Sequence, residues 1–400
     1  MAHIAFVSLA EAGHLNPTLP VARELMARGH RVSYPADASM AERIRPTGAE
    51  IVPYRCEPAA DSAAEPAAEP LVIDGMDAAA RAALGMLKQL AQVLPQIEAG
   101  YRDDRPDVIV SDWLAWAGPM LAAKWGIPRV QSWSAHAASE GYDFGAFADQ
   151  MFAGSPWKPE FDALLADVQA RHGVPPFALR DFYRPAESNL VYQPRAFHVR
   201  NETFDDRYAF VGPTRLPGAE PAGGGWGPPG RPLVYVSLGT IISRPDFFRT
   251  CVRAFAELPC RVLMSVGDGI EPAALGPLPP GVTARQEVPQ PLVLAHADVF
   301  VTAAGMNSAM ESLAAAVPMV AVPHTPEQRT TADRIAELGL GRVLAPAEAT
   351  AERLREAVGG LLHGDDTAAL HGRLEAMREE ICKAGGAPRA ADAIESRLPG

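Results

Sequence analysis

The sequence predicts an α/β protein built from two doubly wound parallel sheets. First, short apolar runs typical of buried parallel strands alternate with segments of helical periodicity. Second, this alternation stops in a Gly- and Pro-rich stretch at 215–232, typical of a linker between domains, and starts again at Leu233. Third, 400 residues are enough for two domains that each bury a core.

The first half begins with a strand, a polar turn and a helix. His3–Leu9 is apolar, the turn at 10–17 contains His14, and the next helix carries apolar residues at helical spacing before it ends at Gly29. Further strands are expected at 31–34, 50–54, 106–112 and 127–133, and further helices at 37–47 and 76–94. Ligands of such sheets bind beyond the carboxyl ends of the strands. His14 and Asp112 lie at two of these ends and are therefore candidate site residues.

The segment 134–184 shows no clear strand and carries large apolar side chains at irregular spacing. Together with the tryptophans before it, the candidates for lining an apolar pocket are Trp113, Trp116, Trp133, Phe144, Phe147, Met151 and Phe152. Aromatic and Met side chains suit such pockets because they are large or adaptable. For each residue singly, packing of loop helices onto the domain is an equal alternative, whereas the cluster favours a pocket. The Ala-, Pro- and Glu-rich segment 57–69 is expected to be a surface loop that could order as a lid.

The second half repeats the alternation of strands and helices. Strands are expected from Leu233 to a turn at 237–240 and at 261–266, 282–285, 299–302 and 319–323. Helices are expected near 245 and at 350–362, 367–383 and 389–398. The small-residue turn at 303–308 leads into a helix, whose first backbone N–H groups suit a phosphate. Asn307 and Ser308 lie at or near its N-cap, and Glu311, one turn on, could accept from ribose hydroxyls. An ordinary βα turn with a polar cap is the alternative, and this turn alone favours it.

The composition excludes several classes of function. A net charge of −12 argues against a nucleic-acid surface, and no apolar run approaches the length of about 18 residues that a membrane span needs. The N-terminus lacks the basic start and cleavage site of a signal peptide, and the four cysteines lack metal-ligand spacing. We therefore expect reduced thiols in a cytoplasmic protein without nucleic-acid or membrane partners. A homodimer is left open.

The stretch 285–334 resembles the donor-nucleotide box of GT-B glycosyltransferases that use activated sugars, most of all the macrolide glycosyltransferase group of actinomycetes. The matching residues are Val288-Pro289-Gln290, Gly305-Met306-Asn307-Ser308, Glu311, Val317-Pro318-Met319 and Glu327-Gln328. In the first half, Gly13-His14 followed by Asn16-Pro17 resembles the family's base motif, and Asp112 falls where the family has the partner acid. The resemblance covers nearly the whole chain and is weak across the acceptor loops.

Two residues depart from the family pattern. Glu287 stands where the family has the tryptophan that stacks on the base. Ala303 stands where it has the histidine that contacts the nucleotide phosphate.

The resemblance implies the GT-B fold, in which two Rossmann-like domains face a deep cleft. The implied parts are an acceptor-binding domain at 1–214, a linker at 215–232, a nucleotide-sugar domain at 233–385 and a helix at 386–400 that crosses back to the first domain. It also implies an inverting displacement. His14, oriented by Asp112, would deprotonate an acceptor hydroxyl, which attacks C1 of a sugar bound as a nucleoside diphosphate.

The donor-binding residues that the resemblance implies are Ser237, Gly239, Thr240, Val288, Gln290, Gly305, Asn307, Ser308, Glu311, Glu327 and Gln328. The 237–240 turn, Asn307 and Ser308 would hold the diphosphate. Gln290 and Glu311 would bind the ribose, and residues 327 and 328 the sugar hydroxyls. Since a helix N-terminus and hydroxyl donors would hold the leaving group, no cofactor or metal ion is expected beside the nucleotide-sugar co-substrate.

Three interpretations follow for the function. The first is a glycosyltransferase that acts on a polyketide or similar apolar product in antibiotic or other natural-product biosynthesis. The second is an enzyme of the same fold that has lost sugar-donor use through Glu287 and Ala303 and applies His14 and Asp112 to another step, such as an elimination or cyclisation. The third, a non-catalytic binding protein, ranks well below both, because the acid–base pair and most donor residues are intact.

Overall fold

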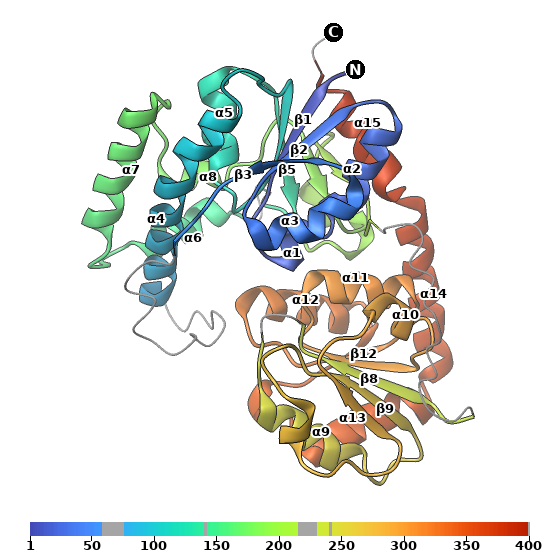
Figure 1. The fold of residues 1–400 in the computed structure, drawn as a ribbon. Helices are drawn as coiled ribbons and strands as arrows, with labels where there is room; N and C mark the ends of the chain where they lie inside the picture. The colour runs from blue at the N-terminus through green and yellow to red at the C-terminus, as the bar shows by residue number, and fades with distance from the viewer. Residues whose placement is uncertain (58–75, 140–141, 215–229, 240–241, 399–400) are drawn as a thin grey trace. The chain divides into compact units, whose positions relative to one another are not determined.

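The computed structural model describes residues 1–57, 76–139, 142–214, 230–239 and 242–398. The described residues form two compact units, one made of the residues up to 214 together with 384–398, and the other made of 230–383. The predicted C-terminal helix therefore belongs to the first unit (Figure 1). Most of the predicted linker and of the expected lid segment, residues 215–229 and 58–69, lies outside the described residues.

The first unit contains a seven-stranded parallel sheet in the order β3-β2-β1-β4-β5-β6-β7. Its strands are β1 His3–Val7, β2 Arg31–Ala36, β3 Glu50–Pro53, β4 Val108–Asp112, β5 Arg129–Trp133, β6 Asn189–Val191 and β7 Tyr208–Phe210. The register pairs Val7 with Ser111 and Asp112 with Ser132. The carboxyl ends of β1, β4 and β5 are therefore level with one another.

Helices connect these strands along the chain. They are α1 Ala12–Leu15, α2 Thr18–Ala27, α3 Ala38–Ile44, α4 Met76–Gly100, α5 Ala117–Trp125, α6 Phe144–Met151, α7 Lys158–His172, α8 Leu179–Phe182 and α15 Gly386–Glu395. The last of these, α15, lies against α2 (Figure 1). Arg28, at the end of α2, donates hydrogen bonds to Asp392 at 2.6 Å and Glu395 at 2.7 Å. These bonds fasten the end of the chain to the first unit.

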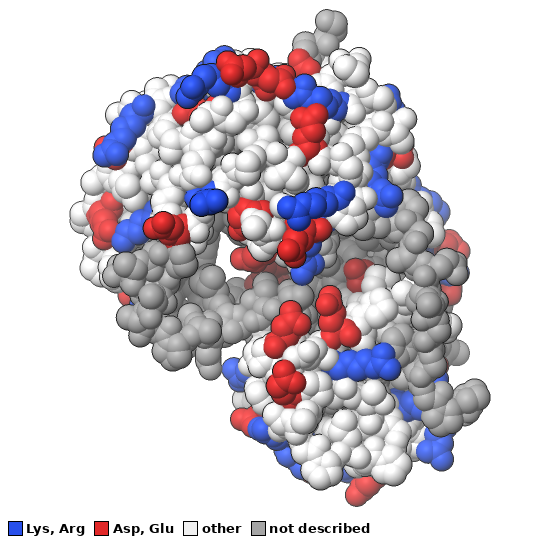
Figure 2. All heavy atoms as spheres, viewed as in Figure 1, with Lys and Arg blue, Asp and Glu red and all other residues white. Residues whose placement is uncertain are grey.

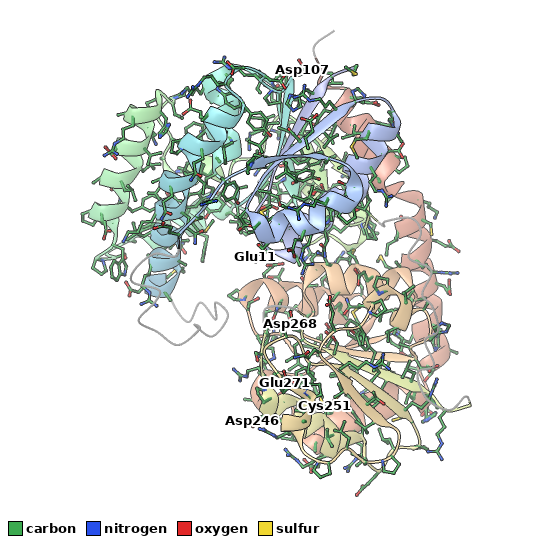
Figure 3. All side chains as sticks on the ribbon, viewed as in Figure 1. Glu11, Asp107, Asp246, Cys251, Asp268 and Glu271 are labelled. Atoms are coloured by element: carbon green, nitrogen blue, oxygen red, sulfur yellow. The ribbon has the colours of Figure 1, made fainter. Side chains whose placement is uncertain are left out.

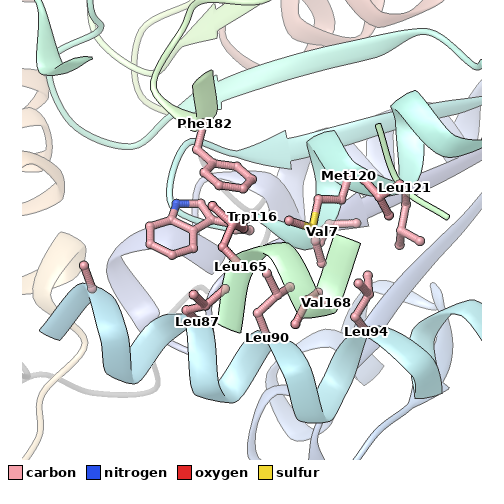
Figure 4. Packing of buried hydrophobic residues seen from close by; sticks show 14 of the residues in the cluster. Val7, Leu87, Leu90, Leu94, Trp116, Met120, Leu121, Leu165, Val168 and Phe182 are labelled. Atoms are coloured by element: carbon pink, nitrogen blue, oxygen red, sulfur yellow. The ribbon is translucent and has the colours of Figure 1, made fainter. Parts of the chain in front are cut away.

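Two apolar cores cover the two faces of this sheet. Successive side chains of a strand point to opposite faces, and in β1 Ile4 and Phe6 enter one core while Ala5 and Val7 enter the other. Figure 4 shows the second core, in which leucines of α4 lie opposite Trp116 and Phe182. A sheet buried on both faces explains why the strands are continuous apolar runs.

The second unit contains a six-stranded parallel sheet in the order β10-β9-β8-β11-β12-β13. Its strands are β8 Leu233–Ser237, β9 Arg261–Ser265, β10 Val282–Arg285, β11 Val299–Thr302, β12 Met319–Ala321 and β13 Gly341–Val343. Its helices are α9 Pro245–Phe255, α10 Gln290–Leu294, α11 Met306–Ala314, α12 Pro326–Glu337, α13 Ala351–His363 and α14 Thr367–Lys383. The prediction of two doubly wound parallel sheets is confirmed.

Several of these elements were not predicted from the sequence. Among them are the strands β6, β7 and β13 and the helices α5, α7, α10 and α12. Each missed strand has only three residues, too few to show a periodicity. The helix α12 opens with a proline at its first position, which is typical of a helix start.

The surface carries charges of both signs. On the face shown in Figure 2, basic side chains of the described residues lie singly or in small groups among acidic ones. None of the helices in the described part of the chain combines the length and the apolar composition needed to cross a bilayer.

Candidate active site

His14 and Asp112 form a hydrogen-bonded pair at the carboxyl edge of the first sheet. His14 lies in α1, directly after β1, and Asp112 is the last residue of the neighbouring β4. The two side chains are joined by a contact of 2.9 Å between Nδ1 and Oδ2. Figure 3 marks the two ends of β1: Glu11 lies beside α1, and Asp107 lies at the opposite end, where it accepts a hydrogen bond from the His3 backbone. The pair thus lies at the edge where such sheets bind ligands.

The burial and bonding of Asp112 define the protonation of the pair. The side chain of Asp112 is 1% exposed, and that of His14 is 13% exposed. A carboxylate can only accept, so Nδ1 of His14 carries the proton that points at Asp112. The lone pair of the neutral ring is therefore on Nε2, where a base needs it.

Ser134 belongs to the same cluster, and the sequence analysis missed it. It follows β5, and its Oγ lies 2.9 Å from His14 Nδ1 and 3.1 Å from Asp112 Oδ2. The other carboxylate oxygen of Asp112 accepts from the Leu114 backbone N–H at 2.9 Å. The one sequence signal for Ser134 was its position after a predicted strand next to the strand of Asp112.

The predicted donor-binding residues lie in the second unit, around the carboxyl ends of β8, β11 and β12. The strands β9 and β10 lie on one side of β8, and β11, β12 and β13 lie on the other. The direction of the strand order thus reverses between β8 and β11, where open α/β sheets bind their ligands. The register pairs Ser237 with Thr302 at this point, and Ser237 Oγ accepts from Gly239 N at 3.2 Å. Thr240 lies outside the described residues.

The turn between β11 and α11 has a strained backbone. Ala304 adopts a left-handed φ of 60°, which costs an ordinary residue about 1–2 kcal/mol. Gly305 is the N-cap of α11, so Asn307 and Ser308 lie in the first turn, as predicted from the sequence. Ala303 is 1% exposed. The helix N-terminus that could receive a phosphate is therefore formed, without a polar side chain at position 303.

Three predicted donor residues are bonded to one another. The Nε2 group of Gln290 donates to Glu311 Oε2 at 2.7 Å and to Ser308 Oγ at 3.1 Å. Tyr235, which the sequence analysis did not single out, donates its hydroxyl to Gln290 Oε1 at 3.2 Å. Burial raises the pKa of Tyr235, so the phenol keeps the proton that it donates. Gln290 is thereby held in one orientation, with α10 and α11 joined through it.

Gln328 has a structural role that the sequence analysis did not foresee. Its Oε1 accepts from the backbone N–H groups of His324 at 2.8 Å and Thr325 at 3.2 Å. In return, the backbone N–H of Gln328 donates to Thr325 Oγ1. This capping box provides acceptors for backbone N–H groups at the start of α12. The carbonyl oxygen of Gln328 is thus engaged, and its NH₂ group is the part suited to a ligand. Burial and the nearby Arg244 lower the pKa of His324 to about 4, so this ring is neutral at pH 7.

The remaining donor candidates differ in exposure. Val288 is buried, Glu327 is exposed in the first turn of α12, and Glu287 is exposed just before α10. Glu287 therefore lies on the surface, three positions before Gln290 in the sequence. Among the described residues, no three His, Cys, Asp or Glu side chains are grouped as metal ligands.

The predicted acceptor residues fall into two groups. Four of them, Trp116, Trp133, Met151 and Phe152, are at most 5% exposed. Trp116 stacks on Phe182 with ring centroids 4.9 Å apart (Figure 4), so packing accounts for its position. Trp113 and Phe144 are half-buried with ring centroids 5.1 Å apart, and Phe147 is 41% exposed. This second group is the one that could contact a ligand in the structure as it stands.

Comparisons with known proteins agree with this architecture. The family model for UDP-glucoronosyl and UDP-glucosyl transferases matches residues 227–369. The NDP-glycosyltransferase YjiC of Bacillus licheniformis is 38% identical over 399 residues, which cover 99% of this chain and 98% of the relative. The demethyllactenocin mycarosyltransferase of Streptomyces fradiae is 41% identical over 417 residues, covering 100% of this chain and 87% of the relative.

Two solved structures are similar along the whole chain. The glycotransferase of kitacinnamycin has a TM-score of 0.86 and 36% identity, covering 100% of this chain and 99% of its own. The calicheamicin glycosyltransferase CalG4 has a TM-score of 0.81 and 35% identity, covering 100% and 98%. This chain is therefore a glycosyltransferase of the GT-B fold and belongs to the family of UDP-glucoronosyl and UDP-glucosyl transferases.

Proposed function

We propose that this enzyme transfers a sugar, with inversion, from a nucleoside diphosphate to a hydroxyl of an apolar natural product, with His14 as the base. The observation that carries the proposal is the 2.9 Å contact between His14 and a buried Asp112 at the carboxyl edge of the first sheet. Relatives named for demethyllactenocin, kitacinnamycin and calicheamicin support a natural-product acceptor. Trp113, Phe144 and Phe147 offer apolar surface for it in the same unit.

The proposed reaction is a single displacement. The acceptor oxygen attacks C1 of the sugar while Nε2 of His14 takes its proton. The bond from C1 to the phosphate oxygen breaks, and the nucleoside diphosphate leaves with the electron pair. His14 becomes an imidazolium, which the Asp112 carboxylate stabilises through Nδ1–H. Since one bond to C1 forms as the other breaks on the opposite face, the configuration at C1 inverts.

The proposed donor site is the carboxyl edge of the second sheet. The N–H groups at the start of α11, with Asn307 and Ser308, would stabilise the leaving diphosphate, so the step uses no metal ion. Glu311 would accept from ribose hydroxyls beside Gln290, which already donates to it. The sugar hydroxyls would be bound by Glu327 and by the NH₂ group of Gln328, because the carbonyl of Gln328 serves the capping box.

We further propose that the site binds uridine and thymidine diphosphate sugars weakly. An aromatic face stacked on a base contributes about 1–3 kcal/mol, and Glu287 supplies none. A charge-assisted hydrogen bond to a phosphate contributes about 1.5–3 kcal/mol, and Ala303 supplies none. These two residues also keep a second candidate function open, in which the His14–Asp112 pair catalyses an elimination or cyclisation without a sugar donor.

A screen of purified enzyme tests the proposal. Nucleoside diphosphate sugars with uracil, thymine or guanine bases would be combined with hydroxylated polyketide acceptors, and products detected by mass spectrometry. The anomeric configuration of any product would be read from its proton coupling constants. Sugar transfer with inversion at C1 is expected. A product with retained configuration would contradict the mechanism, and a dehydrated or cyclised acceptor formed without a donor would establish the second candidate function.

A further inference from the structure

We propose that Ser134 is a positioning residue for the His14–Asp112 pair, in which its hydroxyl fixes the carboxylate and the imidazole together. The inference rests on the proposed function, because it assigns a role within the same site. Three atoms form a closed triangle: His14 Nδ1 to Asp112 Oδ2 at 2.9 Å, His14 Nδ1 to Ser134 Oγ at 2.9 Å, and Ser134 Oγ to Asp112 Oδ2 at 3.1 Å.

The donors and acceptors around the triangle assign every proton in it. The Trp113 indole lies 3.3 Å from Ser134 Oγ and can only donate, so Oγ accepts from it. Asp112 can only accept, so the hydroxyl proton of Ser134 points at Oδ2. The proton on His14 Nδ1 then lies between Oδ2 and Oγ. With the opposite tautomer, the Nδ1 lone pair would face the carboxylate, so the cluster selects the tautomer that leaves Nε2 as the base.

Burial makes this arrangement effective. Counted over the whole residue, Ser134 is 6% exposed and Asp112 is 3% exposed, so little water competes for their hydrogen bonds. Asp112 receives donors from His14, Ser134 and the Leu114 backbone. These donors come from the segments that follow β1, β4 and β5, so the carboxylate is held from three parts of the chain. When His14 takes the acceptor proton, none of these bonds has to rearrange.

Loss of the Ser134 hydroxyl would leave Asp112 with fewer donors and His14 Nδ1–H with one acceptor. A hydrogen bond to a charged group is stronger than one between neutral groups, but part of its free energy stabilises the ground state as well as the transition state. We therefore expect Ser134→Ala to lower kcat roughly ten-fold. The KM values of donor and acceptor should change little, because Ser134 acts through Asp112 and His14.

Ser111→Ala is the matched control. Ser111 is a fully buried serine next to Asp112 on β4, and among the described residues its Oγ has no hydrogen-bond partner. The substitution removes the same atom from the same depth without touching the triangle. It should leave kcat within about two-fold of wild type.

A double-mutant cycle separates positioning from general stability. The turnover of Ser134→Ala, Asp112→Ala and the double variant would be measured at saturating substrates, together with His14→Ala. Because Ser134 acts in part through Asp112, its substitution should lower kcat by a smaller factor in the Asp112→Ala background than in the wild type. Equal loss in both backgrounds would overturn the inference, as would wild-type turnover of a folded Ser134→Ala protein.

The variants also distinguish this inference from the proposed function. Full turnover of folded His14→Ala would remove the proposed base and the inference with it. Lost turnover in His14→Ala combined with full turnover in Ser134→Ala would overturn the positioning role alone. Should Ser134→Ala lower the yield of folded protein, Ser134→Cys provides a slightly larger side chain of the same shape with a weaker donor. Ser134→Cys should also lower kcat, and wild-type turnover of that variant would count against the inference.

Discussion

Replacing Glu287 by tryptophan should strengthen nucleotide binding by about the free energy of one base-stacking contact. Glu287 is exposed and lies three positions before Gln290, the first residue of α10. A tryptophan can therefore be placed there without disturbing a core. The change adds an aromatic face and removes a negative charge near an anionic ligand.

The gain in nucleotide affinity should come mainly from the substitution at position 287. Stacking contributes about 1–3 kcal/mol, which corresponds to roughly 5- to 150-fold in affinity for uridine or thymidine diphosphate. Adding Ala303→His brings a phosphate donor worth about 1.5–3 kcal/mol. Ala303 is 1% exposed, however, and overpacking a buried site typically costs about 1–3 kcal/mol. The two effects nearly cancel, so the double variant should exceed Glu287→Trp by less than about ten-fold.

Calorimetric titration with UDP, dTDP and GDP would measure these affinities. Glu257→Trp is a suitable control, because Glu257 is 78% exposed in the turn before β9, at the amino edge of the same sheet. It should leave the affinities unchanged. Micromolar UDP binding by the wild type would refute the reasoning, since the site would then not need the missing groups. Selective GDP binding by the wild type would instead favour a different role for Glu287, because its carboxylate can accept hydrogen bonds from a guanine edge.

Three further predictions concern stability. Arg28→Ala should lower the free energy of unfolding of the first unit by about 0.5–1.5 kcal/mol in urea titrations at low salt, and by less at high salt, because its partners on α15 are partly exposed. Partial burial raises the pKa of Glu395, but hydrogen bonds from His30 and Arg28 outweigh it and hold the pKa below its usual value. This stabilisation should be complete above the ordinary pKa of a glutamate and disappear as the pH falls through the lowered value, which urea titrations across acidic pH would show. Gly118→Ala should lower the melting temperature, with a cost of about 1–3 kcal/mol, because the new methyl group would lie 2.3 Å from Ser111 Cβ.

The sequence predicted the parts of the fold that have strong local signals. Strands such as β1 and β4 are buried on both faces and therefore appear as continuous apolar runs. The strand β13 has three residues, none fully buried, so only its pairing with β12 identifies it. The start of α12 does have a local signal, a Thr325 cap followed by a proline. The same residue types are common in turns, so this signal alone did not predict a helix.

Some residues of the candidate site could be predicted from the sequence, and others could not. His14 and Asp112 could be found because each lies at the carboxyl end of a predicted strand and matches the pattern of the resembled family, and the structure places them in contact. Ser134 could not be selected, because a single serine after a strand has no distinguishing pattern until the neighbouring strands are in register. Trp116 was predicted to line a pocket but is buried in a core. The sequence does not separate the two, because cores and apolar pockets favour the same aromatic residues.

The most direct test of the proposed mechanism is the turnover of His14→Ala compared with His172→Ala. His172 is a matched control, because its Nδ1 also contacts a carboxylate, Glu98 Oε2 at 2.7 Å, but on α7, away from the carboxyl edge of the sheet. With both proteins folded, His14→Ala should lower kcat by about two to four orders of magnitude, the usual effect of removing a general base. His172→Ala should stay within about two-fold of wild type. Near-wild-type turnover of His14→Ala would contradict the assignment of His14 as the base.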